Sequence, residues 1–283
     1  MASRPESVAL LGPGKSLVGI VTTPDVPAEG ASTACAIVLN AGIIHRVGPN
    51  RLHVEMARAL ADSGLQVVRF DLSGIGDSES RGDSMAPLDA ALTDIRDVLD
   101  TLSATRGIRR FMLIGLCSGA NHAILSAAAD ERVASVALID PYVPRTRRYY
   151  FNHYVGRMTS VRSWWNLVRG KHPIWQAIFG ALLNRSANAG AVADGPDPGE
   201  VKRYLGGVYE RVCRRNVQIL AAFTSDLESQ HNYREQILEA FPEVRFGNAL
   251  ELHYFDGTDH TFSSERSRTR LIDVLVEWSR KVR

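Results

Sequence analysis

The chain has 283 residues, 45% of them hydrophobic, which is enough for one large domain or two small ones with a sizeable core. Its three cysteines are too few and too scattered for a disulfide framework or a zinc site, so we expect no metal and no cofactor. The sequence has no run of consecutive apolar residues long enough to predict a membrane span. Its formal net charge of +2 does not indicate a nucleic-acid partner. Residues 1–6 lack the features of a secretory signal or transit peptide, which favours a cytoplasmic protein.

The first part of the chain alternates short apolar strands with amphipathic helices. Residues 8–11 and 17–23 predict two strands joined by a Gly-Pro-Gly turn, and residues 34–39 form a continuous apolar run typical of a strand buried on both faces. A helix capped by Asn50 and ended by Gly64, a strand over 66–70 and a helix over 87–102 follow. This alternation predicts a parallel sheet that is covered by helices on both faces.

A further apolar strand leads into the sequence Gly115-Leu116-Cys117-Ser118-Gly119, which small residues with helical character follow. Glycines two positions before and after a central residue let a strand and a helix meet around a sharp turn that exposes that residue. A thiol at the start of a helix has its thiolate form favoured. Cys117 is therefore a candidate nucleophile. The alternatives are a buried structural cysteine, or a register shifted by one that makes Ser118 the nucleophile and spoils the glycine spacing.

Three more strands are predicted over 133–139, 217–223 and 250–255, and an amphipathic helix closes the chain. The segment 141–216 has a different composition, with 13 Lys or Arg against 4 Asp or Glu and 11 of the 21 aromatic residues. The rest of the chain has 20 basic against 27 acidic residues. We interpret residues 141–216 as a largely helical cap inserted into a core of residues 1–140 and 217–283.

Acyl-transfer chemistry requires a nucleophile, a base, a carboxylate that orients the base and donors for the oxyanion. Cys117, Asp226 and His260 occur in this order, and each follows a predicted strand. We predict that they are the nucleophile, the orienting acid and the base. Asp140 is a competing acid because it also ends a strand, and Asp226 could instead cap the helix after it.

Together these motifs resemble those of α/β-hydrolases along nearly the whole chain. The resemblance implies a mostly parallel sheet with helices on both faces and an inserted lid. Asn40-Ala41-Gly42-Ile43 stands where many members have His-Gly-x, which implies an oxyanion hole formed by the backbone amides of Ile43 and Ser118.

A narrower resemblance involves the cysteine elbow and three other motifs: Arg46-Val47-Gly48-Pro49, the Gly-rich loop that begins at Arg69-Phe70-Asp71, and Asp259-His260-Thr261-Phe262. These are similar to hydrolases associated with exosortase gene clusters, a resemblance that implies no established substrate. The pattern Gly-x-Cys-x-Gly is also shared with dienelactone hydrolases.

We predict an acyl-transfer enzyme, a thioesterase or acyltransferase, that acts on an activated and hydrophobic acyl group, because thiolates suit activated carbonyls. The basic, aromatic cap suggests that coenzyme A or an acidic acyl carrier protein delivers this group. The candidate substrate contacts are His45, Arg46, Tyr142, Arg145, Arg147, Arg148, Trp164 and Trp165. Alternatively, the first two residues only support their loop and the cap arginines only face solvent.

Two other functions fit the same sequence. One is a carboxyl-ester or lactone hydrolase that needs no carrier. The other is a non-covalent binding or cyclase-like protein that uses the same fold without an acyl-enzyme.

Overall fold

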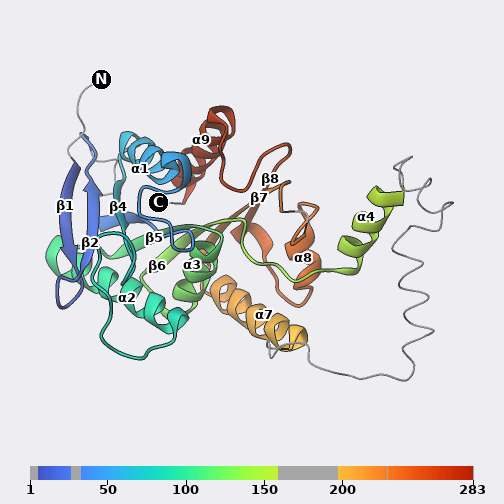
Figure 1. Cartoon of the computed structure of the whole chain (residues 1–283), viewed down its shortest axis with the longest axis horizontal. Coiled ribbons are helices and arrows are strands. Elements are labelled where there is room, and N and C mark those ends of the chain that lie inside the picture. The colour runs from blue at the N-terminus through green and yellow to red at the C-terminus, as the bar shows by residue number, and fades with distance from the viewer. Residues whose placement is uncertain (1–5, 27–32, 159–196, 228, 283) are drawn as a thin grey trace.

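The computed structural model describes residues 6–26, 33–158, 197–227 and 229–282, and Figure 1 shows them as a coloured ribbon. Eight strands form one sheet in the order β1-β2-β4-β3-β5-β6-β7-β8. β2 is antiparallel to both β1 and β4, and the other neighbouring strands are parallel. The strands are β1 (Glu6–Leu11), β2 (Leu17–Thr22), β3 (Ala34–Val38), β4 (Gln66–Phe70), β5 (Arg110–Leu116), β6 (Val133–Ile139), β7 (Gln218–Thr224) and β8 (Leu250–Phe255). The expected, mostly parallel sheet is confirmed.

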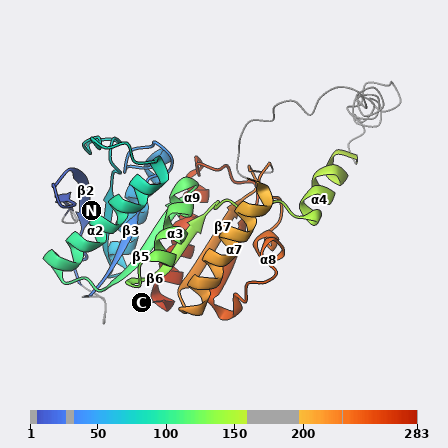
Figure 2. The ribbon, with the colours of Figure 1, turned by 90° about the horizontal axis from the view of Figure 1, so that it is seen from below.

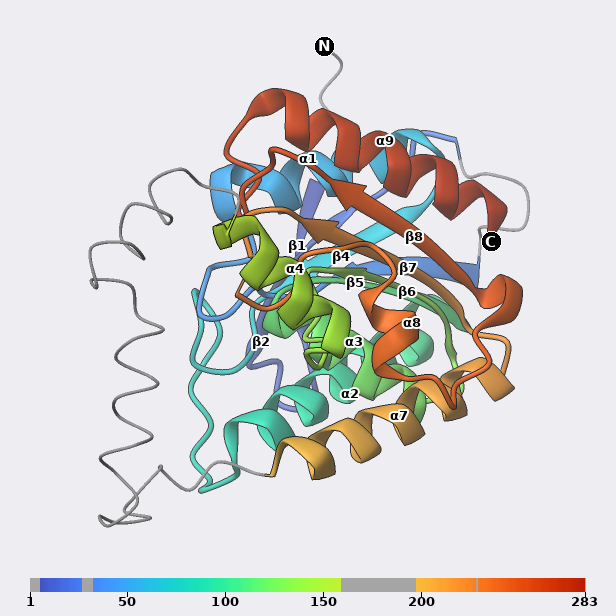
Figure 3. The same cartoon turned by 90° about the vertical axis from the view of Figure 1, so that its right-hand side faces the viewer.

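Helices cover both faces of this sheet, as Figure 3 shows, with α1 and α9 on one face and α2, α3 and α7 on the other. The helices are α1 (Leu52–Asp62), α2 (Pro87–Arg106), α3 (Ser118–Ala129), α4 (Arg147–Met158), α7 (Pro198–Arg214), α8 (Gln236–Ala240) and α9 (Glu265–Lys281), with 3-10 turns at Pro49–Arg51 and Gly247–Ala249. Across the described ranges, we find no helix with the length and apolarity that crossing a membrane requires.

The central strand β5 shows how the sequence pattern produces the two layers. Successive side chains of a strand point to opposite faces of the sheet. Phe111 and Leu113 accordingly pack into the cluster under α2, α3 and α7, whereas Met112 and Ile114 pack into the cluster under α1 and α9. All four side chains are buried. A strand buried on both faces must be apolar at every position, which explains the continuous apolar run.

The segment expected to form a cap divides into parts with different roles. α4 extends away from the sheet, whereas α7 lies along α3 (Figures 1 and 2). Tyr209 and Val212 of α7 are buried in the same cluster as the α3 side chains Ile124 and Ala120. α7 therefore packs with the core although it lies within the predicted cap 141–216, because its apolar face covers the sheet. Residues 159–196 lie outside the described part of the chain.

The turn before α1 differs from the expected capping. Arg51, in a left-handed conformation, precedes the first residue of α1, and the side chain of Asn50 makes no capping hydrogen bond. Instead, Nδ2 of Asn50 donates to the carbonyl oxygen of Thr261 at 3.2 Å. This contact links the turn to the loop that carries His260, since Thr261, the next residue, is 211 residues away from Asn50 in the chain.

The junction of β5 and α3 requires glycine on steric grounds. A Cβ placed on Gly115 would lie 2.1 Å from the backbone of Gly119, and a Cβ on Gly119 would lie 2.5 Å from the carbonyl oxygen of Asn40. No side chain can be accommodated against backbone atoms at these distances. The two glycines of the motif thus allow the strand and the helix to approach each other.

We expect Gly115→Ala to lower the free energy of unfolding by about 3 kcal/mol or more, because its methyl group would overlap backbone atoms that cannot move independently. Gly14→Ala is the matched control, since a Cβ there meets open space. Urea unfolding of both variants, followed by circular dichroism, measures the difference. Equal stability of the two variants would contradict the close approach.

Candidate active site

The sharp turn holds Cys117 at the start of α3, directly after β5. Its backbone has φ 58° and ψ −119°, a conformation that residues with a side chain rarely adopt. Such strain persists only where the surrounding structure enforces it, and it is common at active sites. The turn therefore has the geometry that the glycine pattern predicts.

The thiol of Cys117 faces a histidine. A hydrogen bond with His260 lowers the pKa of the thiol, and the backbone amide of Ser118 lowers it further, while partial burial opposes both effects. Cys35 and Cys213 are free thiols in a different environment, since burial raises their pKa to about 12 and about 11. Only a thiolate is strongly nucleophilic, so these pKa shifts favour Cys117 over Cys35 and Cys213 as the candidate nucleophile.

A buried carboxylate orients His260. Nδ1 of His260 lies 2.7 Å from Oδ2 of Asp140, which leaves Nε2 to face Cys117. This hydrogen bond, with the one to Cys117, raises the pKa of His260 to about 10. Burial opposes the ionisation of Asp140, but its contact with His231 and its hydrogen bonds from His260 and Thr224 outweigh burial and lower the pKa of Asp140 to about 2. The geometry favours a thiolate, an imidazolium and a carboxylate in one row.

The prediction that Asp226 orients the ring of His260 is wrong. Oδ2 of Asp226 accepts a bond from the backbone amide of His260 at 3.3 Å, while the ring nitrogen is on Asp140. Both aspartates follow neighbouring parallel strands, so both reach the same edge of the sheet. Thr224, the last residue of β7, donates to Asp140 through its amide and its hydroxyl, each at 2.7 Å. The end of β7 therefore supports Asp140, and the loop after β7 does not supply the partner of the His260 ring.

The oxyanion loop lies over the elbow. The backbone amide of Gly42, a residue with φ +58°, donates to Oγ of Ser118 at 2.8 Å. This contact brings the loop after β3 to the start of α3, as an oxyanion hole requires. The side chain of Ile43 is 90% exposed. The assignment of the Ile43 and Ser118 amides as oxyanion donors stays a prediction.

Behind this loop, Arg46 lies between two carboxylates. Its guanidinium pairs with the fully buried Asp71, and Nη2 donates to Asp77 at 2.6 Å. The Arg46 amide also donates to Asp71 at 2.6 Å, and the Asn40 side chain does so at 3.1 Å. His45, Asp71 and Asp77 have the spacing of a metal site, but the guanidinium of Arg46 already pairs with an oxygen of each carboxylate. The arrangement favours support of the loop by Arg46, and substrate contact by His45 and Arg46 stays a prediction.

An apolar cavity of about 480 Å³ opens beside the elbow. It is lined by residues of α3, α7, the start of α2 and the segment after β6: Leu88, Ser118, Asn121, His122, Leu125, Tyr142, Glu200, Val201, Tyr204 and Leu205. Because Ser118 lines the cavity and directly follows Cys117 in the chain, this end of the cavity lies next to the thiol. The predicted substrate contact Tyr142 lines the cavity, whereas its α7 wall cannot be predicted from a sequence in which this helix falls within the expected cap.

The predicted cap contacts have separate environments. Nε of Arg145 donates to the carbonyl oxygen of Ser229 at 3.0 Å, and Arg148 pairs with Glu239 at 3.1 Å. Arg147 is exposed at the start of α4. The arginines thus are not one continuous free surface, and their binding of substrate stays a prediction. The other two predicted contacts, Trp164 and Trp165, lie outside the described residues.

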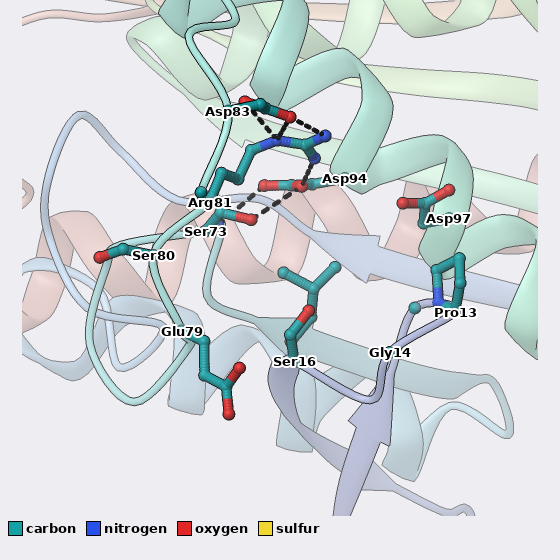
Figure 4. A pocket seen from close by; sticks show the side chains of 13 residues that line it. Pro13, Gly14, Ser16, Ser73, Glu79, Ser80, Arg81, Asp83, Asp94 and Asp97 are labelled. Atoms are coloured by element: carbon teal, nitrogen blue, oxygen red, sulfur yellow. Dashed lines mark hydrogen bonds and ion pairs between the residues drawn. The ribbon is translucent and has the colours of Figure 1, made fainter.

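A second hollow, of about 310 Å³, lies between the β1–β2 turn, the loop after β4, and α2 (Figure 4). Arg81 donates there to Asp83 and Asp94, and the hydroxyl of Ser73 donates to Asp94 at 2.9 Å. Figure 4 shows these side chains turned toward one another. Its lining residues do not follow β5, β6 or β8, the strands that precede the three aligned residues. We place no step of the reaction in this hollow.

Comparison with known proteins agrees with this geometry. Residues 36–262 match the family model described as the alpha/beta hydrolase fold. The chain belongs to the α/β-hydrolase fold family. A search of curated proteins finds no match.

Solved structures of α/β-hydrolases are similar over nearly the whole chain. An α/β serine hydrolase without lid from Xanthomonas campestris has 19% identity and a TM-score of 0.56, covering 99% of this chain and 95% of that one. A dienelactone hydrolase from Anabaena variabilis has 12% identity and a TM-score of 0.60, with 99% and 98% covered. The naproxen esterase of Bacillus subtilis has 17% identity and a TM-score of 0.57, with 98% and 91% covered. At these identities the likeness shows the fold.

Alkylation of Cys117 tests which aspartate orients His260. In Asp140→Asn the imidazolium loses its anionic partner, so the pH midpoint for reaction of Cys117 with iodoacetamide should rise by about one unit or more. The direct repulsion between Asp140 and the thiolate acts in the opposite direction, but it is weaker than the effect of the His260 hydrogen bond on the pKa of the thiol. Asp226→Asn should shift the midpoint less than half as far. Peptide mass spectrometry across a pH series measures both shifts.

The other two cysteines are internal controls for this experiment. Cys35 and Cys213 should stay unlabelled at pH 7 in every variant, because burial raises the pKa of each thiol. A larger shift in Asp226→Asn than in Asp140→Asn would contradict the assignment of the acid.

Proposed function

We propose that the protein is an acyl-transfer enzyme, a thioesterase or acyltransferase, with Cys117 as nucleophile, His260 as base and Asp140 as orienting acid. The observation that carries the proposal is the row of hydrogen bonds that joins the thiol, the imidazole and the buried carboxylate. A structural cysteine would need neither the strained backbone nor the histidine partner. The order nucleophile, acid, histidine along the chain is retained with Asp140 in place of Asp226.

In the proposed mechanism, the thiolate of Cys117 attacks the acyl carbonyl and a carbon–sulfur bond forms. Donors of the oxyanion hole, the amides of Ile43 and Ser118 in this proposal, stabilise the developing charge. The bond to the leaving group then breaks, and the leaving group takes the proton from Nε2 of His260. An acceptor, water or an alcohol, amine or thiol, gives its proton to Nε2 and attacks the acyl-enzyme, which releases the Cys117 thiolate.

The apolar cavity supports a hydrophobic acyl group as the substrate. Its lining includes Leu125 of α3 and Leu205 of α7, and Ser118 borders the thiol end. Burial of an acyl chain there contributes about 0.8 kcal/mol for each methylene group. Thiolates react well with activated carbonyls, so we propose a thioester or a lactone as the reacting group.

The proposal also includes an acyl carrier, a narrower group of related hydrolases and a cellular compartment. Coenzyme A or an acidic carrier protein would meet the exposed guanidinium of Arg147, since Arg145 and Arg148 already have partners. We also propose a relation to the exosortase-associated hydrolases, on the motifs that resemble them. A reducing, cytoplasmic compartment would keep Cys117 a free thiol.

A carboxyl-ester or lactone hydrolase without a carrier is the second candidate function. The fold is shared with a structure described as a dienelactone hydrolase and with one described as naproxen esterase. In this case water is the acceptor and the same three residues act.

Cys117→Ala should abolish turnover of acyl thioesters and aryl esters and the acyl adduct seen by intact-protein mass spectrometry, because no nucleophile remains. Cys117→Ser should keep the fold and lose at least about 100-fold in kcat, because the contact with His260 favours a thiolate, which serine cannot provide. Full turnover in Cys117→Ala, or turnover without any adduct in the wild type under rapid quench, would contradict the covalent mechanism. Preference for thioesters over aryl esters separates the two candidate functions.

Leu125→Trp should shorten the range of acyl chains that the enzyme accepts, because the larger ring fills the cavity. We expect kcat/KM for a dodecanoyl thioester to fall about tenfold or more relative to a butanoyl thioester. Leu238→Trp is the control, since Leu238 is an exposed residue of α8 outside the cavity lining. Identical chain-length profiles for both variants would contradict the proposal that the cavity binds the acyl chain.

A further inference from the structure

The buried carboxylate of Asp140 contacts a second histidine in addition to His260. Nε2 of His231 lies 3.2 Å from Oδ1 of Asp140, and the side chains of both residues are completely inaccessible to solvent. Oδ2, the other oxygen, accepts from His260 and from the hydroxyl of Thr224. The carboxylate therefore lies between two imidazole rings, one facing the thiol and one facing the interior.

Other contacts fix the position of the second ring. It packs edge to face on Phe223, with ring centroids 4.9 Å apart. The amide of His231 donates to the carbonyl oxygen of Leu227 at 3.0 Å, and the buried side chain of Gln236 donates to the carbonyl oxygen of Gln230 at 2.9 Å. The loop after β7 is thus held at the residues on which the ring depends.

The polar surroundings of this ring point to Asp140 as its partner. Neither ring nitrogen of His231 has a hydrogen-bond partner of regular geometry among the described residues, and Oδ1 of Asp140 lies within ion-pair distance of Nε2. A buried imidazole without a partner costs free energy. The 3.2 Å contact offers a partner to the imidazole, and it adds a donor to Oδ1 of Asp140, which already accepts from the amide of Thr224 at 2.7 Å.

We propose that His231 is a positioning residue: its Nε2–H donates to Oδ1 of Asp140 and holds the carboxylate so that Oδ2 faces Nδ1 of His260. This inference rests on the proposed function, since it assigns a role in the same active site. It also accounts for an acid that follows β6, because the end of β7 and the loop after β7 contribute the donors Thr224 and His231 to Asp140.

Titratable groups from several elements surround Asp140 and His231. Asp140 faces His231 from the end of β6, and His260 faces Asp140 from the loop after β8. Cys117 contacts the far side of His260, and Asp226 contacts its backbone amide. A change at His231 therefore reaches the thiol through Asp140 and His260.

Two variants with a matched control test the proposal. His231→Phe keeps an aromatic ring on Phe223 and removes the donor, so the pH midpoint for alkylation of Cys117 should rise by about one unit. His231→Gln keeps an N–H donor and should restore at least half of that shift. His253→Gln is the control, because His253 pairs with Glu251 on β8 and makes no described contact with Asp140. A folded His231→Phe variant with the wild-type midpoint would overturn the proposal.

A measurement on the unmodified protein applies even if His231→Phe fails to fold. Long-range 1H–15N correlation spectra of the 15N-histidine-labelled protein report which ring nitrogen carries the proton. We expect a proton on Nε2 of His231, and a tautomer with the proton on Nδ1 alone would overturn the proposal.

Alkylation and the spectra need no substrate, so they separate the two proposals. Absence of an acyl adduct in the wild type, with a shifted midpoint in His231→Phe, would remove the enzymatic function and leave the positioning role. Turnover with an adduct, together with an unshifted midpoint in His231→Phe, would leave the enzymatic function and remove the positioning role of His231.

Discussion

The buried carboxylate of Asp140 is the contact on which the arrangement of the site depends. A charge in an apolar interior is tolerated only when hydrogen bonds compensate for its lost hydration. Thr224 and His260 provide three such bonds, each 2.7 Å long, from segments that follow or end different strands. The amide of Asp140 donates to the carbonyl oxygen of Ala222, so the register of β6 and β7 fixes the position of the carboxylate. Sheet pairing and active-site geometry are thereby coupled.

Backbone strain marks the same positions. Cys117 and Asp140 both have positive φ, at 58° and 47°, and they follow the neighbouring strands β5 and β6. Neither residue is glycine, so each conformation costs free energy that the packing of the sheet and helices must offset. Gly115 and Gly119 permit the approach of strand and helix, while the strain itself falls on the residue whose side chain must project. The two strained turns therefore cost free energy, and they place the side chains of Cys117 and Asp140 at the carboxyl ends of their strands.

Local patterns explain why most elements could be predicted. The continuous apolar run before Gly115 and the helical spacing of Leu92, Ile95 and Leu99 depend only on neighbours in the chain, and the structure forms β5 and α2 there. The basic and aromatic composition of residues 141–216 places α7 in the predicted cap. In the structure its buried Tyr209 packs on Phe241 and Phe246 and shares a cluster with side chains of α3, and composition carries no information about such contacts.

The sequence by itself determined the alternating strands and helices, the glycine-bounded turn around Cys117 and the late histidine, because each depends on residue type and short spacing. It could not decide between Asp140 and Asp226, since both lie between Cys117 and His260 and both follow parallel strands. Tertiary structure decided for Asp140, where Thr224 donates twice and His260 presents Nδ1. The direction of a side chain and the donors that meet it come from residues distant in the chain, and only folding brings them together.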